Sequence, residues 1–228
     1  MAMIILIILV FFIILYPQFY VQKILGKYKA YPKTFSLTGF QLAEELLSQN
    51  HVKGVVVEKI EGPDHYDPMA KAVRLHLSHF EGHDLTSLVV AAHEVGHALQ
   101  DHQNYSLLKL RTTLATWAQF LQKFGSLFMM ATPLLALVTR SPRIGAISLF
   151  LGLAGLFSNA IINFVTLPVE IDASFKRALP ILEKRNEFGL NEQRAAHEIL
   201  RACAYTYLAS SLADLLNVMR WLAILRKR

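Results

Sequence analysis

Residues 91–99, Ala-Ala-His-Glu-Val-Gly-His-Ala-Leu, place two histidines four positions apart, with a glutamate directly after the first. On a helix, His93 and His97 share one face, one turn apart, so both imidazoles can reach a single ion. Zinc accepts neutral imidazole nitrogens, and three protein ligands plus one water make a catalytic site. Glu94 lies about 100° around the helix from His93. The spacing therefore predicts a zinc site in which Glu94 takes a proton from a metal-activated water.

The motif lies in a segment with helical periodicity. Asp84 is a good N-cap, and apolar residues recur at helical spacing from Leu85 to Leu99. The predicted helix is apolar nearly all round, so we expect it to be buried, with Gly96 leaving room for a neighbouring helix. Burial of two imidazoles and a carboxylate without partners is costly, and a metal removes that cost. The alternative, a polar cluster without a metal, is therefore disfavoured.

The residues after the motif exclude one class of zinc peptidase. Metzincins carry glycine and histidine three and six positions after the second motif histidine. This chain has Gln100 and Gln103 there. His102 is one position off, and we expect it at a helix end or on the surface.

A third metal ligand is expected in residues 167–174, Leu-Pro-Val-Glu-Ile-Asp-Ala-Ser. Pro168 suits the first turn of a new helix, and a carboxylate near that end is favoured by the helix dipole. Glu170 is the predicted ligand. Asp172 stays open as an alternative ligand, or as an acceptor that orients a ligand histidine.

A peptidase also needs a donor for the oxyanion of its tetrahedral intermediate. Tyr207 is the favoured candidate, and Tyr205, His197 and His65 are weaker ones. The expected strand around Val73–Leu77 precedes the zinc helix and could pair with an extended substrate, although an ordinary core strand is an equally good interpretation.

The motifs HEVGHALQ, LPVEIDAS and DHYDP followed by VRL resemble those of the YugP-type neutral zinc metallopeptidases, a family of bacterial membrane proteins. These motifs fall at residues 64–76, 92–100 and 167–174, with 204–209 as a weaker fourth element. The resemblance therefore covers most of the chain outside its N-terminal block.

The layout is also similar to that of the HtpX/Ste24-like membrane gluzincins, in which a transmembrane hairpin separates HExxH from the glutamate ligand. This similarity implies His93, His97 and Glu170 as zinc ligands and Glu94 as general base. One departure concerns the common Glu-x-x-x-Asp pattern, because the fourth residue after Glu170 is Ser174.

The composition favours a membrane protein, with 54% hydrophobic and 18% charged residues, against roughly 25% charged in soluble domains. The apolar residues are gathered in blocks. Residues 2–21 can cross a bilayer core of ~30 Å, and no small-x-small cleavage site follows them. We therefore expect residues 1–21 to form an uncleaved transmembrane anchor.

Two further apolar blocks, at 117–138 and 144–167, are joined by the short link 139–143. They are expected to pair as two antiparallel membrane helices, which makes residues 117–167 a transmembrane hairpin. The predicted peptidase domain then consists of residues 22–116 and 168–228. Its last apolar block, 204–225, is open to two interpretations, a membrane span or an amphipathic helix.

Basic residues lie mostly on the side of the predicted domain, and the link carries only Arg140 and Arg143. By the positive-inside rule, we expect a multi-pass protein of the cell membrane whose domain faces the cytoplasm. The net charge of +6 would suit nucleic acid, but the basic residues form no aromatic-interleaved stripe. Nucleic acid is therefore excluded as a partner, and the lipid bilayer is expected instead.

The expected fold is mainly α with a small β element (α+β), a minigluzincin-like domain with an inserted transmembrane helix hairpin. Residues 55–57 and 72–78 are expected as two short strands, a hairpin-like pair around the turn-rich segment 62–68. The predicted function is that of a membrane-bound zinc-dependent endopeptidase acting on peptide or protein substrates. The alternatives are a zinc-binding, non-proteolytic scaffold or chaperone-like protein, and a transporter accessory. The sequence predicts neither cleavage specificity nor oligomeric state.

Overall fold

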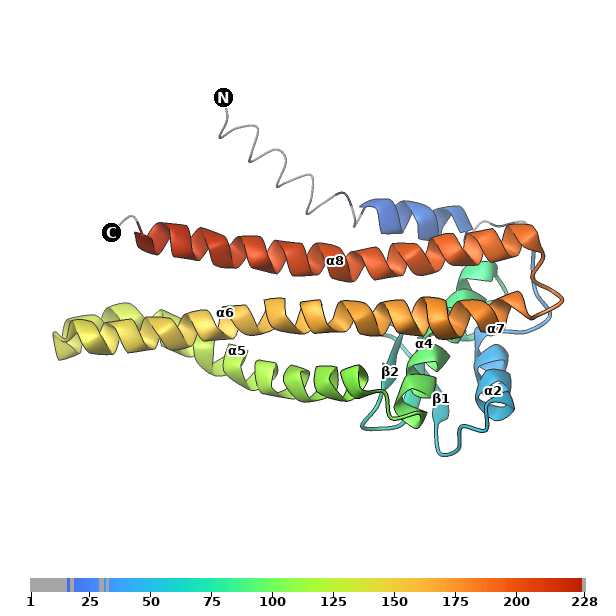
Figure 1. Cartoon of the computed structure of the whole chain (residues 1–228), viewed down its shortest axis with the longest axis horizontal. Coiled ribbons are helices and arrows are strands. Elements are labelled where there is room, and N and C mark those ends of the chain that lie inside the picture. Colours follow the sequence, from blue (N-terminus) through green and yellow to red (C-terminus); the bar gives the residue numbers. More distant parts are fainter. Residues whose placement is uncertain (1–15, 17–18, 29–30, 32, 227–228) are drawn as a thin grey trace, which may run out of the picture. The chain divides into compact units, whose positions relative to one another are not determined.

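The computed structural model describes residues 16, 19–28, 31 and 33–226, and it is mainly helical (Figure 1). Beyond a helix at 19–28, the helices are α2 (Gly39–Gln49), α3 (Leu77–Phe80), α4 (Leu85–His102), α5 (Ser106–Thr139), α6 (Pro142–Ile171), the π-helix η1 (Asp172–Ala178), α7 (Leu179–Glu183) and α8 (Leu190–Arg226). The strands are β1 (Val56–Ile60), β2 (His65–Asp67) and β3 (Ala72–His76). The prediction of a mainly α fold with a small β element is confirmed.

The chain forms two compact units, each built from separate stretches of sequence. Among the described residues, one holds those of 16–109 and 167–206, and the other holds 110–166 and 207–226. Most of the predicted N-terminal anchor, residues 1–21, lies outside the described residues. In the ranges that the structure describes, no helix combines the length and the apolar character that crossing a bilayer requires.

The sheet corrects the predicted hairpin. β3 is the central strand and β1 runs parallel to it, with Val57 opposite Val73. β2 is the antiparallel partner of β3, with Tyr66 opposite Val73, and it lies inside the segment that was predicted to be only a turn. A strand of three residues between two prolines carries too little alternation to be recognised, because Pro63 and Pro68 indicate a loop.

α2 and α4 both begin at a side-chain cap, and the cap of α4 is the one predicted from the sequence. Thr38 caps α2 in a reciprocal capping box with Gln41. Asp84 caps α4 by accepting from the backbone N–H of Ser87 at 3.1 Å. α4 is buried along nearly its whole length, as predicted from the apolar residues on nearly all of its faces.

The segment around Pro168 differs from expectation. Pro168 lies inside α6 and does not begin a new helix. The helix continues through it into η1 and α7, so the predicted helix 170–182 is a direct extension of the apolar block before it. α8 is continuous from Leu190 to Arg226, so the block 204–225 belongs to a helix that begins before it.

In the second unit, α5 and α6 form an antiparallel hairpin. A Cβ added at Gly155 would lie 2.8 Å from the carbonyl oxygen of Leu121, so the two backbones approach closely. The hydroxyls of Thr132 and Ser148 hydrogen-bond across the same contact at 2.9 Å. Small residues and short hydroxyl side chains allow this packing.

Candidate metal centre

Two histidines of α4 meet one carboxylate from the end of α6. The Nε2 atom of His93 lies 3.1 Å from Oε2 of Glu170, and Nε2 of His97 lies 3.3 Å from the same oxygen. All three side chains are buried, and each offers a ligand atom within 4.8 Å of the others. Two imidazoles and a carboxylate match the donor set of catalytic zinc sites, so this group could hold a metal ion.

Close packing between α4 and η1 brings these side chains together. A Cβ on Gly96 would lie 2.7 Å from the carbonyl oxygen of Ala173. Gly96 stands between the two histidines on α4, and Ala173 follows Glu170 by three residues. The missing side chain thus sets the distance between the imidazoles and the carboxylate.

The charge state of Glu170 follows from this contact. Its side chain is 1% exposed, and burial by itself raises the pKa of a carboxyl group. The imidazoles of His97 and His93 outweigh this effect and hold the pKa of Glu170 well below its ordinary value. Glu170 is therefore an anion, as a metal ligand must be.

Each histidine has a second partner on its Nδ1 atom. Ser174 Oγ lies 3.1 Å from Nδ1 of His93, and Gln100 Oε1 lies 3.0 Å from Nδ1 of His97. Sequence reasoning missed both partners. Only their positions could have indicated them. Gln100 is three residues after His97, and Ser174 is four residues after Glu170, spacings at which side chains on a helix are neighbours.

Asp172 lies apart from the cluster of three. Its Oδ2 atom accepts from Gln100 Nε2 at 2.9 Å and from Arg177 Nε at 2.7 Å. Burial would raise the pKa of Asp172, but these two donors hold it below the usual value. Of the two acids considered from the sequence, Glu170 is the one that lies beside both imidazoles.

The Glu94 carboxylate lies beside β2, and it is also close enough to His93 and Glu170 for their charges to affect its pKa. Burial raises the pKa of Glu94 to about 7; His93 opposes this shift, while Glu170 and Asp64 add to it. The backbone N–H of Tyr66 hydrogen-bonds to the Glu94 carboxylate. The Tyr66 hydroxyl in turn donates to Asp101 Oδ2 at 2.6 Å, which ties β2 to the far end of α4.

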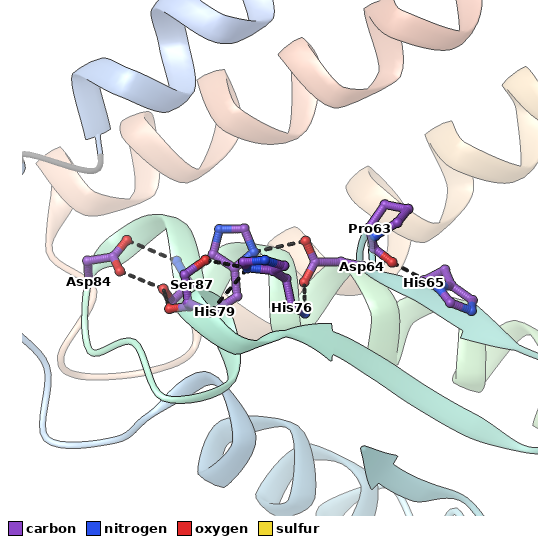
Figure 2. A network of polar contacts seen from close by, with 8 residues as sticks. Pro63, Asp64, His65, His76, His79, Asp84 and Ser87 are labelled. Atoms are coloured by element: carbon purple, nitrogen blue, oxygen red, sulfur yellow. Dashed lines mark hydrogen bonds and ion pairs between the residues drawn. The ribbon is translucent and has the colours of Figure 1, made fainter. Parts of the chain in front are cut away.

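A polar network beside β2 holds Asp64 in place (Figure 2). Asp64 accepts from the backbone N–H of His76 at 2.7 Å and from Nδ1 of His79 at 2.8 Å. Burial favours the neutral acid, yet these hydrogen bonds hold the pKa of Asp64 below its ordinary value. Its negative charge is one of those that raise the pKa of Glu94.

The candidates for an oxyanion donor have varied surroundings. Tyr207 belongs to α8, and its side chain lies outside the described part of the chain. The Tyr205 ring packs on Tyr20, with ring centroids 6.0 Å apart, and His197 packs on Phe175 at 5.2 Å. His65 is exposed, and its Nδ1 lies 2.9 Å from the carbonyl oxygen of Pro63 (Figure 2).

The prediction that the strand around Val73–Leu77 could pair with a substrate is wrong. β3 already has a neighbour on each edge, so its backbone groups are occupied. Sheet edges are left on β1 and β2, and of these β2 carries the N–H that contacts Glu94.

Comparison with known proteins agrees with this donor set. The family model described as "Putative neutral zinc metallopeptidase" matches residues 3–226. The chain is 33% identical over 213 residues to the "Putative membrane protease YugP" of Bacillus subtilis (strain 168), covering 92% of this chain and 90% of the relative. No solved structure matched the chain.

The contact at Gly96 leads to a first prediction. In Gly96→Ala, the new methyl group would force η1 away from α4. Overpacking costs about 1–3 kcal/mol, and the ~1 kcal/mol that alanine gains over glycine in a helix offsets part of it. We therefore expect a net loss of up to ~2 kcal/mol in the free energy of unfolding. Zinc affinity should fall too, because Glu170 lies only two residues before η1 begins. Chemical denaturation and zinc titration measure the two effects.

Gly62→Ala is the matched control, because its Cβ would meet only Ile60 Cδ1 at an ordinary 3.8 Å. This variant should keep wild-type stability and zinc affinity. Equal behaviour of Gly96→Ala and Gly62→Ala would contradict the role given to the α4–η1 contact.

Proposed function

Since this chain belongs to the neutral zinc metallopeptidase family, we propose that it hydrolyses peptide bonds at a zinc ion held by His93, His97 and Glu170. Glu94 is the general base in this proposal. The substrates are peptides or proteins, in keeping with the family description.

One observation carries the proposal. Two imidazoles and an anionic carboxylate offer ligand atoms within 4.8 Å of one another in a buried site. Buried titratable groups of this kind are costly unless they bind one another or a metal. A donor set of two histidines and one glutamate is that of known catalytic zinc peptidase sites, in which the fourth position is left for water.

Zinc and Glu94 have different roles in the proposed hydrolysis. When bound, zinc supplies Lewis acidity that lowers the pKa of water to about 7 and polarises a carbonyl group. Glu94 accepts a proton on its carboxylate from the attacking water and returns it to the leaving amine. Burial raises the pKa of Glu94 to about 7, and the positive charge of a bound zinc ion would lower it toward the carboxylate form that a general base needs.

Glu94 also separates this function from its alternative. A zinc-binding scaffold or chaperone-like protein needs the three ligands but not a second buried carboxylate beside them. Glu94 is buried and adjacent to His93, a position that has a clear use in hydrolysis and none in a structural site.

We expect Glu94→Gln to bind zinc as the wild type does and to lose about 10²- to 10⁴-fold in peptide hydrolysis, the range that general bases contribute. Metal analysis of the purified protein and cleavage of a casein or peptide library measure the two properties. Glu44→Gln, at an exposed position of α2, is the matched control and should keep full activity. Wild-type hydrolysis by Glu94→Gln would refute the mechanism.

We also propose that the protein is a multi-pass protein of the cell membrane, with its peptidase unit facing the cytoplasm. This part rests on the apolar blocks at 117–138 and 144–167, on the distribution of basic residues, and on the name of the Bacillus subtilis relative. The link 139–143 would then lie outside the cell.

In whole cells that carry Cys203→Ala, an impermeant maleimide should label Ser141→Cys. The matched variant His51→Cys, next to α2, should be labelled only after the membrane is opened. The protein should stay with membranes washed in alkaline carbonate. Release by carbonate, or labelling of both cysteines in intact cells, would contradict this membrane topology.

A further inference from the structure

Gln100 is a fully buried polar residue on α4, one turn beyond His97. Its side chain makes three hydrogen bonds. Oε1 lies 3.0 Å from Nδ1 of His97, while Nε2 donates to the carbonyl oxygen of Val169 at 2.8 Å and to Asp172 Oδ2 at 2.9 Å. A buried amide with three satisfied bonds is held in one orientation.

The partners of Gln100 decide which way its amide faces. The Val169 carbonyl can only accept. The Asp172 carboxylate also accepts, because Oδ2 receives the guanidinium Nε of Arg177 at 2.7 Å in an ion pair. The amide nitrogen of Gln100, which is the donor, must therefore face these two groups, and the amide oxygen must face His97.

This orientation determines the proton on His97. An amide oxygen only accepts, so Nδ1 of His97 must carry the hydrogen. In the neutral imidazole, the lone pair is then on Nε2, the atom that lies 3.3 Å from Glu170 Oε2. Ser174, the partner of His93, has a hydroxyl that can donate or accept, so it does not impose a tautomer in the same way.

We propose that Gln100 is a positioning residue, which fixes His97 as the Nδ1–H tautomer and directs its Nε2 lone pair toward the metal. Val169 and the Asp172–Arg177 ion pair hold Gln100 in turn. This inference rests on the proposed zinc site, and it assigns roles to residues that touch neither the metal nor the substrate.

The π-helix η1 makes this arrangement possible. In a π-helix the repeating hydrogen bond joins residues five apart, as between the N–H of Leu179 and the carbonyl of Ser174. Asp172 and Arg177 are also five apart and lie within hydrogen-bond distance. In an α-helix the facing pairs are three or four apart. η1 thus places the Asp172–Arg177 pair where Asp172 can accept from Gln100. The same segment places Ser174 beside His93.

The test compares two glutamines at the same ion pair: Gln100 bonds to Asp172, and Gln103 bonds to Arg177. Gln100→Met keeps the length and burial of the side chain but removes its amide. We expect zinc affinity to fall about 10- to 100-fold, the effect of losing a hydrogen-bond partner of a ligand histidine. The visible spectrum of the Co²⁺-substituted protein should change as well. Gln103→Met loses a 2.6 Å contact with Arg177 Nη1, but its site is exposed and away from the imidazole, so it should bind zinc like the wild type.

A second measurement needs no substitution. In a long-range ¹H–¹⁵N correlation spectrum of the zinc-loaded wild type, His97 should coordinate through Nε2 and carry its proton on Nδ1. Coordination of His97 through Nδ1 would overturn the inference even if Gln100→Met does not fold. Wild-type zinc affinity in a folded Gln100→Met would overturn it too.

These outcomes are separate from those that test the proposed function. A wild-type protein that binds no zinc would refute the metal site itself. A wild type that binds zinc, with affinity unchanged in Gln100→Met, would refute the role of Gln100 alone.

Discussion

The structure depends on the close approach of α4 and the segment at the end of α6. Gly96 allows the backbone of Ala173 to come within a distance that any side chain would prevent, and Glu170 is thereby placed beside His93 and His97. Each group offsets the cost of burying the others, because an anion and two imidazoles are costly to bury alone. The same contact that stabilises the fold also creates the candidate metal centre.

α4 carries both histidines of the candidate metal centre and also Glu94. Its histidines face α6 and η1. Ser174 of η1 bonds to His93, and Gln100 of α4, itself held by Asp172, bonds to His97. Glu94 lies beside β2, where burial, together with the charges of Glu170 and Asp64, raises its pKa to about 7. One buried helix therefore supplies both the two histidines and the carboxylate of the proposed general base.

The parts that could be predicted from the sequence are those with local signals. The spacing of His93 and His97, the cap Asp84, and the apolar periodicity of α4 each depend on a few adjacent residues. β2 was missed because it has only three residues and lies between Pro63 and Pro68, while its pairing is with a separate strand. Gln100 served only to exclude metzincins, since its bonds to Val169 and Asp172 arise when segments about 70 residues apart pack together.

The most direct test of this account is X-ray absorption at the zinc edge of the metal-loaded wild-type protein. The account predicts one zinc per chain, with two imidazole nitrogens and carboxylate or water oxygens at about 2.0–2.2 Å. A thiolate sulfur neighbour at about 2.3 Å would contradict it; Cys203 is the single cysteine of the chain. A shell with fewer than two imidazoles would contradict it equally.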